Sequence, residues 1–305
     1  MNILVTGSSG FLGKALRGPL ANDHYVVALN SKSADLTKEE SLAKYNDVTY
    51  DIIFHLAAWT QAGDFCLYHQ GEQWIINQQI NTNTLSWWRK YQPQAKMIAF
   101  GTSVSYSTEE NLSEDVYMMG IPNEKFYAYA MSKRMLYSGL ISLNRQFGMK
   151  YLYLVPSTLY GPNYHTDGRQ MHFIFDLIRK IIRGKEYGEK VELWGDGYQR
   201  REIVYIDDFI GTLIKLSITV DNDIVNVGAG QDFSIREFAF QICDIVGYDF
   251  NKLSFDTTKY VGARSKILSI DKLKRILPEM NMISLKEGLI NTIKWFYDDK
   301  IYDLP

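Results

Sequence analysis

The sequence predicts an α/β protein whose core is a doubly wound parallel sheet. Short apolar, β-branched runs alternate with stretches of helical periodicity along the first half of the chain. The first run, Asn2–Thr6, ends at glycines, and a helical pattern over Phe11–Leu20 follows it. Such alternation is typical of parallel strands covered by helices on both faces, as in Rossmann-type sheets. Ligands of these sheets bind beyond the carboxyl ends of the strands.

The other expected elements follow in chain order. Further short apolar runs predict strands at Tyr25–Leu29, Ile52–Ala57, Lys96–Phe100, Tyr151–Val155 and Asp223–Val227. Helical periodicity predicts helices over Glu72–Lys90 and Tyr127–Phe147, and a further helix at about 171–182.

The pattern changes after residue 161, where charged and glycine-rich segments replace the regular alternation. We therefore divide the chain into a larger lobe, residues 1–161 and 203–228, and a smaller, discontinuous α+β lobe, residues 162–202 and 229–305. The cleft between the lobes is the expected ligand site.

Composition argues against several classes of protein. The chain has 305 residues, of which 46% are hydrophobic and 22% charged, and a formal net charge of −2. These values are typical of a globular protein and argue against a nucleic-acid binder that relies on positive charge. The two cysteines and five histidines lack the spacing of a metal site, so no metal is expected. We see no signal peptide and no run long enough for a membrane helix, and expect a cytoplasmic protein without a membrane partner.

Three glycines directly after the first strand predict a dinucleotide site. A strand that turns tightly into a helix needs glycine where φ is positive and where the backbone approaches a diphosphate. The helix N-terminus adds N–H groups and a partial positive charge. A glycine-rich turn that binds nothing is the alternative. The expected cofactor contacts in this turn are Gly7, Ser8, Ser9, Gly10, Phe11, Leu12 and Gly13.

The tip of the second strand favours NADP over NAD. An acidic residue at this point would bind the adenosine ribose of NAD and repel a 2′-phosphate. Asn30 and Lys32 occupy the tip, and the first carboxylate, Asp35, comes later and is followed by Leu36. A cation suits a 2′-phosphate, although Lys32 as a solvated surface lysine is the alternative.

Tyr129 and Lys133 form the expected catalytic pair. At positions i and i+4 they project from one face of a helix. We expect the ammonium to stabilise the phenolate and to lower the tyrosine pKa. Thr102, at the end of a preceding strand, can donate a hydrogen bond to a substrate oxygen, and Ser103 and Ser105 are rivals for that role. Local capping of the backbone is the alternative for all three hydroxyls.

Several separated motifs resemble those of the extended short-chain dehydrogenases/reductases. They are T-G-x-x-G-x-x-G at 6–13, H-x-A-A at 55–58, Y-x-x-x-K at 129–133 and Y-G-P-N at 160–163. Longer segments are similar to the GDP-L-fucose synthase branch, whose members are epimerase/reductases of GDP-4-keto sugars. They include NQQINTNTL from Asn77, ELWGDGYQRREIVYIDD from Glu192 and NVGAGQDFSIRE from Asn226, and the resemblance spans essentially the whole chain.

The resemblance implies roles for individual residues. Thr102, Tyr129 and Lys133 would form the reduction triad, with Asn77 on the neighbouring helix. Trp194 would border the guanine or ribose, while Arg201, Lys266 and Lys180 would hold the diphosphate. Further implied cofactor contacts are Leu56, Ala57, Ala58, Pro156, Leu159 and His172, and further implied substrate contacts are Ser103, Val104, Thr158, Phe173 and Leu177. The resemblance also implies a homodimer, formed by pairing of the helices that carry Asn77 and Tyr129.

One position departs from the pattern of this branch. The branch places a catalytic cysteine two residues after the catalytic hydroxyl, where this chain has Val104, whereas His172 matches the histidine that works with it. Valine cannot exchange a proton, so we expect an NADPH-dependent C4 reductase of a GDP-linked 4-keto sugar, a 6-deoxyhexose or a heptose, with epimerisation lost or impaired. His172 would then orient the sugar or simply pack.

Four alternatives to this interpretation stay open. They are a complete epimerase/reductase, a UDP-sugar 4-epimerase, an NADP-binding regulator without chemistry and a structural subunit of a sugar-modifying complex.

Overall fold

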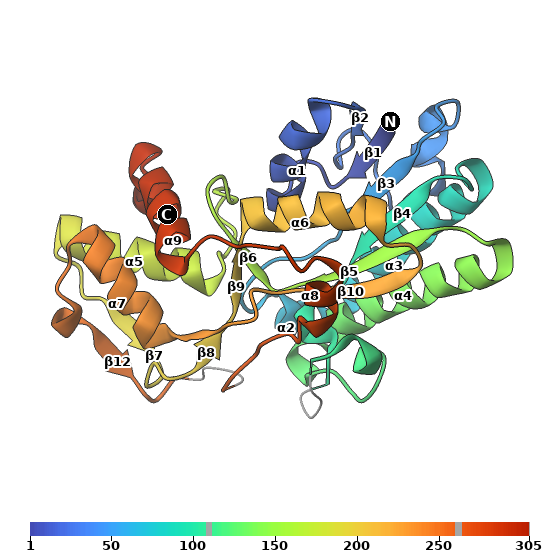
Figure 1. The fold of residues 1–305 in the computed structure, drawn as a ribbon. Coiled ribbons are helices and arrows are strands. Elements are labelled where there is room, and N and C mark those ends of the chain that lie inside the picture. The colour runs from blue at the N-terminus through green and yellow to red at the C-terminus, as the bar shows by residue number, and fades with distance from the viewer. Residues whose placement is uncertain (108–111, 260–263, 305) are drawn as a thin grey trace.

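A six-stranded parallel sheet forms the centre of the larger lobe (Figure 1). The computed structural model describes residues 1–107, 112–259 and 264–304. Across the sheet the strands run β2 (Tyr25–Ala28), β1 (Asn2–Thr6), β3 (Ile52–His55), β4 (Lys96–Phe100), β5 (Tyr151–Pro156) and β10 (Asp223–Val227). The predicted Rossmann-type fold class is confirmed.

The order of the strands creates a switch point between β1 and β3. From β1 the chain moves to β2 on one side and then crosses to β3 on the other. Thr6, the last residue of β1, pairs with His55, the last residue of β3. The loops after these two strands therefore leave the sheet side by side, which is where doubly wound sheets bind ligands.

Helices cover both faces of the sheet because side chains alternate along each strand. Ile3 and Val5 of β1 pack into one core with α1 (Phe11–Ala21) and α6 (Ile206–Thr219). Leu4, between them, packs into the opposite core with α3 (Gln70–Tyr91) and α4 (Tyr127–Phe147). The helices that carry the predicted catalytic residues thus share one face of the sheet.

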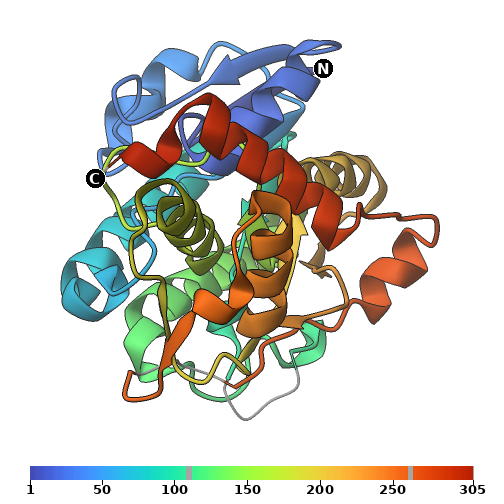
Figure 2. The ribbon, with the colours of Figure 1, turned by 90° about the vertical axis from the view of Figure 1, so that its left-hand side faces the viewer.

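The smaller lobe has its own hydrophobic core, built around α5 (Phe173–Tyr187), α7 (Ile235–Val246) and α9 (Leu285–Asp298) (Figure 2). Three pairs of short strands complete the sheet structure: β7 (Glu192–Trp194) with β12 (Ser254–Asp256), β8 (Arg200–Arg201) with β11 (Phe233–Ser234), and β6 (Thr158–Tyr160) with β9 (Ile203–Tyr205).

The remaining helices are short. They are α2 (Phe65–Tyr68), α8 (Asp271–Ile276) and the 3₁₀ turns η1 (Glu39–Tyr45), η2 (Ser103–Ser105), η3 (Glu114–Val116), η4 (Glu124–Phe126), η5 (Phe250–Lys252) and η6 (Ile301–Asp303). Within the described ranges, no helix combines the length and apolar character needed to cross a membrane.

The ends of some elements differ from the prediction. Two strands stop early, β2 at Ala28 and β3 at His55. Helix α5 continues to Tyr187, five residues beyond the expected end, and closes on Gly188 with φ +69°. Glycine adopts this left-handed conformation without strain, so it ends the helix.

Candidate active site

The glycine turn after β1 has the shape that a bound diphosphate requires. Gly7 has φ +66°, and a Cβ at this position would lie 2.8 Å from the Ala57 backbone nitrogen. A Cβ on Gly13 would lie 2.4 Å from the Gly7 carbonyl oxygen. Helix α1 begins after Gly10 without a side-chain cap, so its first N–H groups remain available for an anion. The turn therefore fits a dinucleotide.

A buried chain of hydrogen bonds holds the ends of β1 and β3 together. The Thr6 hydroxyl accepts from Ala57 N–H at 3.2 Å and lies 3.1 Å from His55 Nδ1, while His55 Nε2 lies 3.2 Å from Asn81 Oδ1. Because Thr6 already accepts one bond, its proton points to His55, which in turn donates to Asn81. Burial lowers the pKa of His55 to about 4, so the ring is neutral.

The tip of β2 folds into a turn around Asn30. Its side-chain oxygen accepts from the backbone N–H groups of Lys32 at 2.9 Å and Ser33 at 3.1 Å. Lys32 is exposed, whereas the Asp35 carboxylate accepts from the Thr37 hydroxyl at 2.7 Å. The cation thus stays open to solvent while the nearest carboxylate is engaged locally, an arrangement that agrees with the expected NADP preference.

Tyr129 and Lys133 lie together on α4, with Lys133 Nζ 5.7 Å from the centre of the tyrosine ring. Lys133 is only 5% exposed, and burial lowers its pKa to about 8. Burial also raises the pKa of Tyr129. The expectation that Lys133 lowers this pKa is therefore wrong. Loss of water disfavours the phenolate more than the neighbouring groups favour it, and Tyr129 is a neutral proton donor at pH 7.

Thr102 lies at the end of β4, where it caps the η2 turn. Its Oγ1 accepts from Val104 N–H at 3.4 Å, which leaves the hydroxyl proton for another acceptor. Ser105 is fully buried and donates to the Ala130 carbonyl at 3.2 Å, so it cannot take the predicted catalytic role. Ser103 and Val104 are half-buried beside Thr102 in the same turn.

Buried tyrosines hold the Tyr129–Lys133 pair in position. The sequence motifs do not reveal them. The Tyr153 hydroxyl donates to the Lys133 carbonyl at 2.7 Å and lies 3.2 Å from the Tyr117 hydroxyl. A Cβ on Gly101 would come within 2.7 Å of that Tyr117 oxygen, so the strand end before Thr102 packs tightly against it. No local sequence pattern signals this packing, because the tyrosines come from β5 and from the loop before α4.

Asn77 is buried, and its side chain holds the loop after β3 through two hydrogen bonds. It accepts from Trp59 N–H at 2.9 Å and donates to the Trp59 carbonyl at the same distance. The loop held in this way brings Thr60 and Cys66 to the Tyr129 side chain. No sequence motif marks either residue as part of the site.

The two lobes meet around the glycine turn. The Phe11 ring, predicted as a cofactor contact, packs edge-on against Tyr164 with ring centres 5.0 Å apart. Across the cleft, Asp64 N–H donates to Gln170 Oε1 at 3.3 Å. His172, just before α5, has an exposed side chain, although the protein groups around its ring and the charge of nearby His165 lower its pKa to about 4.

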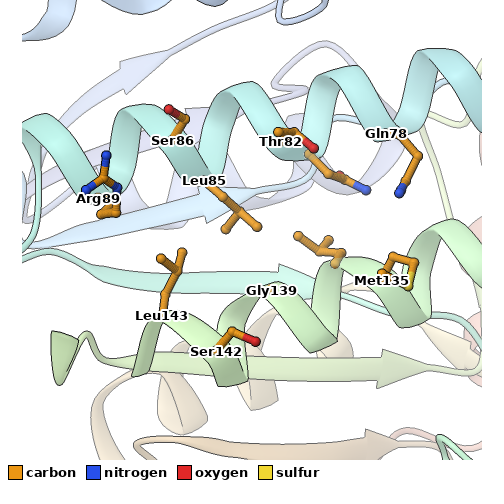
Figure 3. A pocket seen from close by; sticks show the side chains of 11 residues that line it. Gln78, Thr82, Leu85, Ser86, Arg89, Met135, Gly139, Ser142 and Leu143 are labelled. Atoms are coloured by element: carbon orange, nitrogen blue, oxygen red, sulfur yellow. The ribbon is translucent and has the colours of Figure 1, made fainter. Parts of the chain in front are cut away.

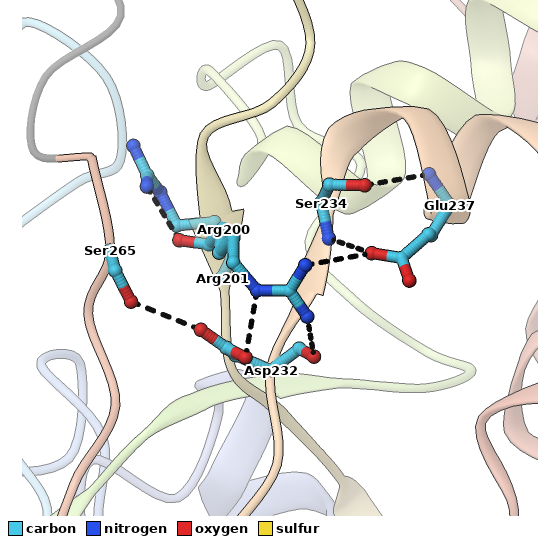
Figure 4. A network of polar contacts seen from close by, with 6 residues as sticks. All are labelled: Arg200, Arg201, Asp232, Ser234, Glu237 and Ser265. Atoms are coloured by element: carbon cyan, nitrogen blue, oxygen red, sulfur yellow. Dashed lines mark hydrogen bonds and ion pairs between the residues drawn. The ribbon is translucent and has the colours of Figure 1, made fainter.

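Arg201 and Lys266 lie close together although they are far apart in sequence. Burial and the Arg201 charge lower the pKa of Lys266 to about 7. Their sequence neighbours Arg200 and Ser265 are joined by hydrogen bonds to one carboxylate (Figure 4). Arg200 Nε and the Ser265 hydroxyl each donate to Asp232 at 3.0 Å. Two adjacent cations form a site for an anion such as a diphosphate.

Most of the other predicted substrate contacts are engaged within the smaller lobe. Leu177 is 3% exposed and belongs to the core of the smaller lobe, so we correct its role from sugar contact to packing. Lys180 pairs with Asp176 of its own helix at 2.9 Å, which satisfies its charge without a ligand. The Phe173 ring packs against Phe238 with centres 5.5 Å apart, whereas Trp194 is 54% exposed on β7.

The remaining predicted contacts divide into buried residues and residues that are at least partly exposed. Ser8 and Leu36 are buried, so only their backbone groups can reach a cofactor. The half-buried or exposed ones are Ser9, Leu12, Leu56, Ala57, Ala58, Pro156, Thr158 and Leu159.

Comparison with known proteins identifies the family. A model of the NAD dependent epimerase/dehydratase family matches residues 3–228. The chain belongs to this family. An epimerase/dehydratase of this kind is an enzyme that uses a nicotinamide dinucleotide, and both predictions are confirmed at this level.

Full-length relatives support the predicted resemblance. GDP-L-colitose synthase of Yersinia pseudotuberculosis is 29% identical and covers 99% of this chain and 100% of its own. GDP-L-fucose synthase of Dictyostelium discoideum is 28% identical, with 97% and 95% covered. The resemblance to the GDP-L-fucose synthase branch is therefore confirmed.

Solved structures share the fold of this epimerase/dehydratase over nearly the whole chain. A GDP-L-fucose synthetase from Naegleria fowleri has a TM-score of 0.86 at 22% identity, with 98% of this chain and 94% of that chain covered. A GDP-6-OMe-4-keto-L-xylo-heptose reductase from C. jejuni has the same TM-score and identity, with 98% of each chain covered.

Proposed function

We propose that the protein is an NADPH-dependent reductase that converts the C4 ketone of a GDP-linked sugar, a 6-deoxyhexose or a heptose, to an alcohol. The observation that carries the proposal is the η2 turn beside Tyr129. This turn holds the hydroxyl of Thr102 but has Val104 where the fucose synthase branch has its catalytic cysteine. The reduction groups are present, whereas one of the two proton-transfer groups that epimerisation needs is missing.

The relatives agree with this substrate class. The full-length relatives are named as synthases of GDP-L-colitose and GDP-L-fucose. Structures with the same fold include a GDP-mannoheptose C4 reductase from Campylobacter jejuni with NADP bound. We propose that residues 1–161 and 203–228 bind NADPH, and that residues 162–202 and 229–305 bind the GDP-sugar.

The residues of the site suit this reaction. When bound, a reduced nicotinamide supplies the hydride that adds to sugar C4. As negative charge develops on O4, Tyr129 gives its phenolic proton to that oxygen and Thr102 donates a hydrogen bond to it. Lys133 stabilises the resulting phenolate, which regains a proton from solvent. Arg201 and Lys266 hold the diphosphate and so fix the sugar above the cofactor.

The test is a set of GDP-4-keto sugars, 6-deoxyhexoses and heptoses, incubated with NADPH in D₂O. We expect NADPH consumption, a C4 alcohol by NMR, and no deuterium at C3 or C5 beyond the enzyme-free rate. Deuterium at either carbon above that rate would refute the reductase-only proposal.

The second candidate is a complete epimerase/reductase, which His172 favours. Its ring is open to the cleft and neutral, so it can accept a proton from a carbon next to the ketone. Under this alternative His172→Asn abolishes deuterium incorporation. Under our proposal Val104→Cys is the variant that introduces it.

We also propose a homodimer formed by α3 and α4. A groove of about 380 Å³ runs between these helices, lined by Leu85, Met135 and Leu143 among others (Figure 3). Light scattering on the purified protein tests this, and a monomer at micromolar concentration would contradict it.

A further inference from the structure

A buried arginine on α4 binds three backbone carbonyls. Arg134 directly follows Lys133 on this helix and is only 3% exposed. Its Nε donates to the Ser105 carbonyl at 2.8 Å, and its two terminal nitrogens donate to the Gly120 and Met119 carbonyls at 2.8 and 2.7 Å. Because a guanidinium keeps its charge in proteins, these are charge-assisted hydrogen bonds, which are the stronger kind. Arg134 thus fastens two segments that precede α4 onto that helix.

Ser105 connects Arg134 to Thr102. The Ser105 N–H donates to the Thr102 carbonyl at 3.0 Å, which closes the η2 turn. The Ser105 hydroxyl donates to the Ala130 carbonyl at 3.2 Å. Ala130 and Arg134 each directly follow a member of the proposed catalytic pair along α4. The helix therefore holds the η2 turn at two positions adjacent to that pair.

A second connection runs from Arg134 to the end of β4 through Tyr117. This tyrosine lies two residues before the Met119 carbonyl that Arg134 binds, and its side chain is fully buried. A Cβ on Gly101 would lie 2.7 Å from the Tyr117 hydroxyl oxygen, so the strand end packs tightly against the ring. Both connections therefore converge on the strand end that carries Thr102.

We propose that Arg134 is a positioning residue that holds the Thr102 hydroxyl where it and Tyr129 can reach the same substrate oxygen. The inference rests on the proposed reductase function, in which Tyr129 gives its proton to sugar O4 and Thr102 donates a hydrogen bond to it. Arg134 acts through the backbone of Ser105 rather than on the sugar itself. Since a displacement of about 1 Å at a reacting centre can cost about 10²-fold in rate, loss of this clamp should lower turnover.

A double-mutant cycle with Thr102→Val tests this route. In otherwise wild-type protein we expect Arg134→Met to lower kcat about 10- to 100-fold, with KM little changed. In the Thr102→Val background the same substitution should lower kcat by less than about threefold, because the hydroxyl that Arg134 positions is already gone. An equal loss in both backgrounds would overturn the inference, since Arg134 would then act independently of Thr102.

Lys96→Met is the matched control for lost stability. Lys96 is 8% exposed at the start of β4, where its Nζ donates to the Ser217 and Val220 carbonyls at 2.6 and 2.5 Å and pairs with Asp221 at 2.8 Å. It is thus another buried cation bound to backbone carbonyls, at the opposite end of β4 from the η2 turn. Lys96→Met should lower the melting temperature but leave kcat close to the wild-type value. A kcat loss as large as that of Arg134→Met would assign the effect to general destabilisation and overturn the inference.

Arg134→Lys repeats the cycle in case Arg134→Met does not fold. This variant keeps the positive charge but lacks the planar fork that binds both segments at once. We expect its kcat to lie between those of the wild type and Arg134→Met, with the loss again confined to protein that retains Thr102. Wild-type kcat in both Arg134 variants would overturn the inference.

Hydrogen exchange in the absence of substrate keeps this inference separate from the proposed function. The N–H groups of Val104 and Ser105 both donate to Thr102, so their exchange reports on the η2 turn. By mass spectrometry we expect faster deuterium uptake over residues 103–105 in Arg134→Met than in the wild type, and wild-type uptake there in Lys96→Met. Unchanged uptake in Arg134→Met refutes the clamp, whereas failure of the wild type to reduce any GDP-4-keto sugar refutes only the function.

Discussion

Two lysines of the cleft, Lys133 and Lys266, have lowered pKa values for different reasons. Burial alone lowers the pKa of Lys133 to about 8, and its neighbour Tyr129 is a neutral phenol. At Lys266 the charge of Arg201 adds to burial, and the pKa falls to about 7. Lys133, the proposed catalytic lysine, thus keeps its charge at pH 7, whereas Lys266 is about half-charged, and we expect a bound anion to raise that charge.

This difference assigns separate tasks to the two regions. The region of Tyr129 consists of oriented, mostly neutral hydroxyls, as a proton transfer requires. In the region of Arg201 and Lys266, the charge of Arg201 disfavours the protonated form of Lys266, and we propose that a bound diphosphate favours it. Substitutions at Tyr129 should therefore affect turnover, and substitutions at Lys266 should affect substrate affinity.

The largest effect is expected at the proton donor. Tyr129→Phe removes the acidic proton, so kcat should fall by about 10²- to 10⁴-fold. The NADPH dissociation constant, measured by fluorescence, should change only a few-fold. Tyr127→Phe is the control, because Tyr127 is 44% exposed on the same helix. Undiminished turnover in Tyr129→Phe would remove the tyrosine from the mechanism.

His55 should make the catalytic region sensitive to acid. Its folded pKa of about 4 lies below the ordinary value of 6.5, so its stabilising contribution is complete above pH 6.5 and is lost as the pH falls toward 4. By pH 5 the loss amounts to about 2 kcal/mol in the free energy of unfolding.

Urea denaturation at pH 7.5 and pH 5 measures this loss. We expect His55→Asn to lose less stability between these two pH values than the wild type does. An equal loss in both proteins would show that His55 does not titrate on unfolding.

Lys266 should make GDP binding depend on pH. Bound diphosphate raises the pKa of Lys266, so above pH 7 binding takes up a proton and the affinity falls as the pH rises. Calorimetry with GDP in buffers of different ionisation enthalpy measures this uptake. Lys266→Arg should bind GDP without it, and Lys266→Met should bind about 10- to 100-fold more weakly, as for a lost charged hydrogen bond.

The control for Lys266 is Lys286→Met, which removes an exposed cation of α9 that pairs with Asp244. GDP affinity that is flat between pH 6 and 9 in the wild type would contradict a half-charged Lys266.

The smallest effect is expected at Lys180. Because it pairs with Asp176 on the same helix, its charge is already satisfied. Lys180→Ala should change KM for the GDP-sugar by less than about threefold, in the range of an exposed ion pair. A loss as large as that of Lys266→Met would place Lys180 in the diphosphate site after all.

Much of the fold and part of the site could be predicted from local patterns. The glycine turn is an example, because Gly7 needs a positive φ and Gly13 a close backbone approach whatever lies elsewhere in the chain. The Tyr129–Lys133 pair follows from helical spacing alone. The direction of the Tyr129 pKa shift could not be predicted in this way, because it depends on how much protein surrounds the phenol.

The sequence by itself determined the strand–helix alternation, the dinucleotide turn and the valine at position 104. Only the tertiary structure decided that the Ser105 hydroxyl is engaged by the Ala130 carbonyl, and that Arg201 lies close enough to Lys266 to lower its pKa. The physical reason is distance along the chain. Helical and strand periodicities relate residues a few positions apart, whereas these contacts join segments that the order of the strands and the packing of the two lobes bring together.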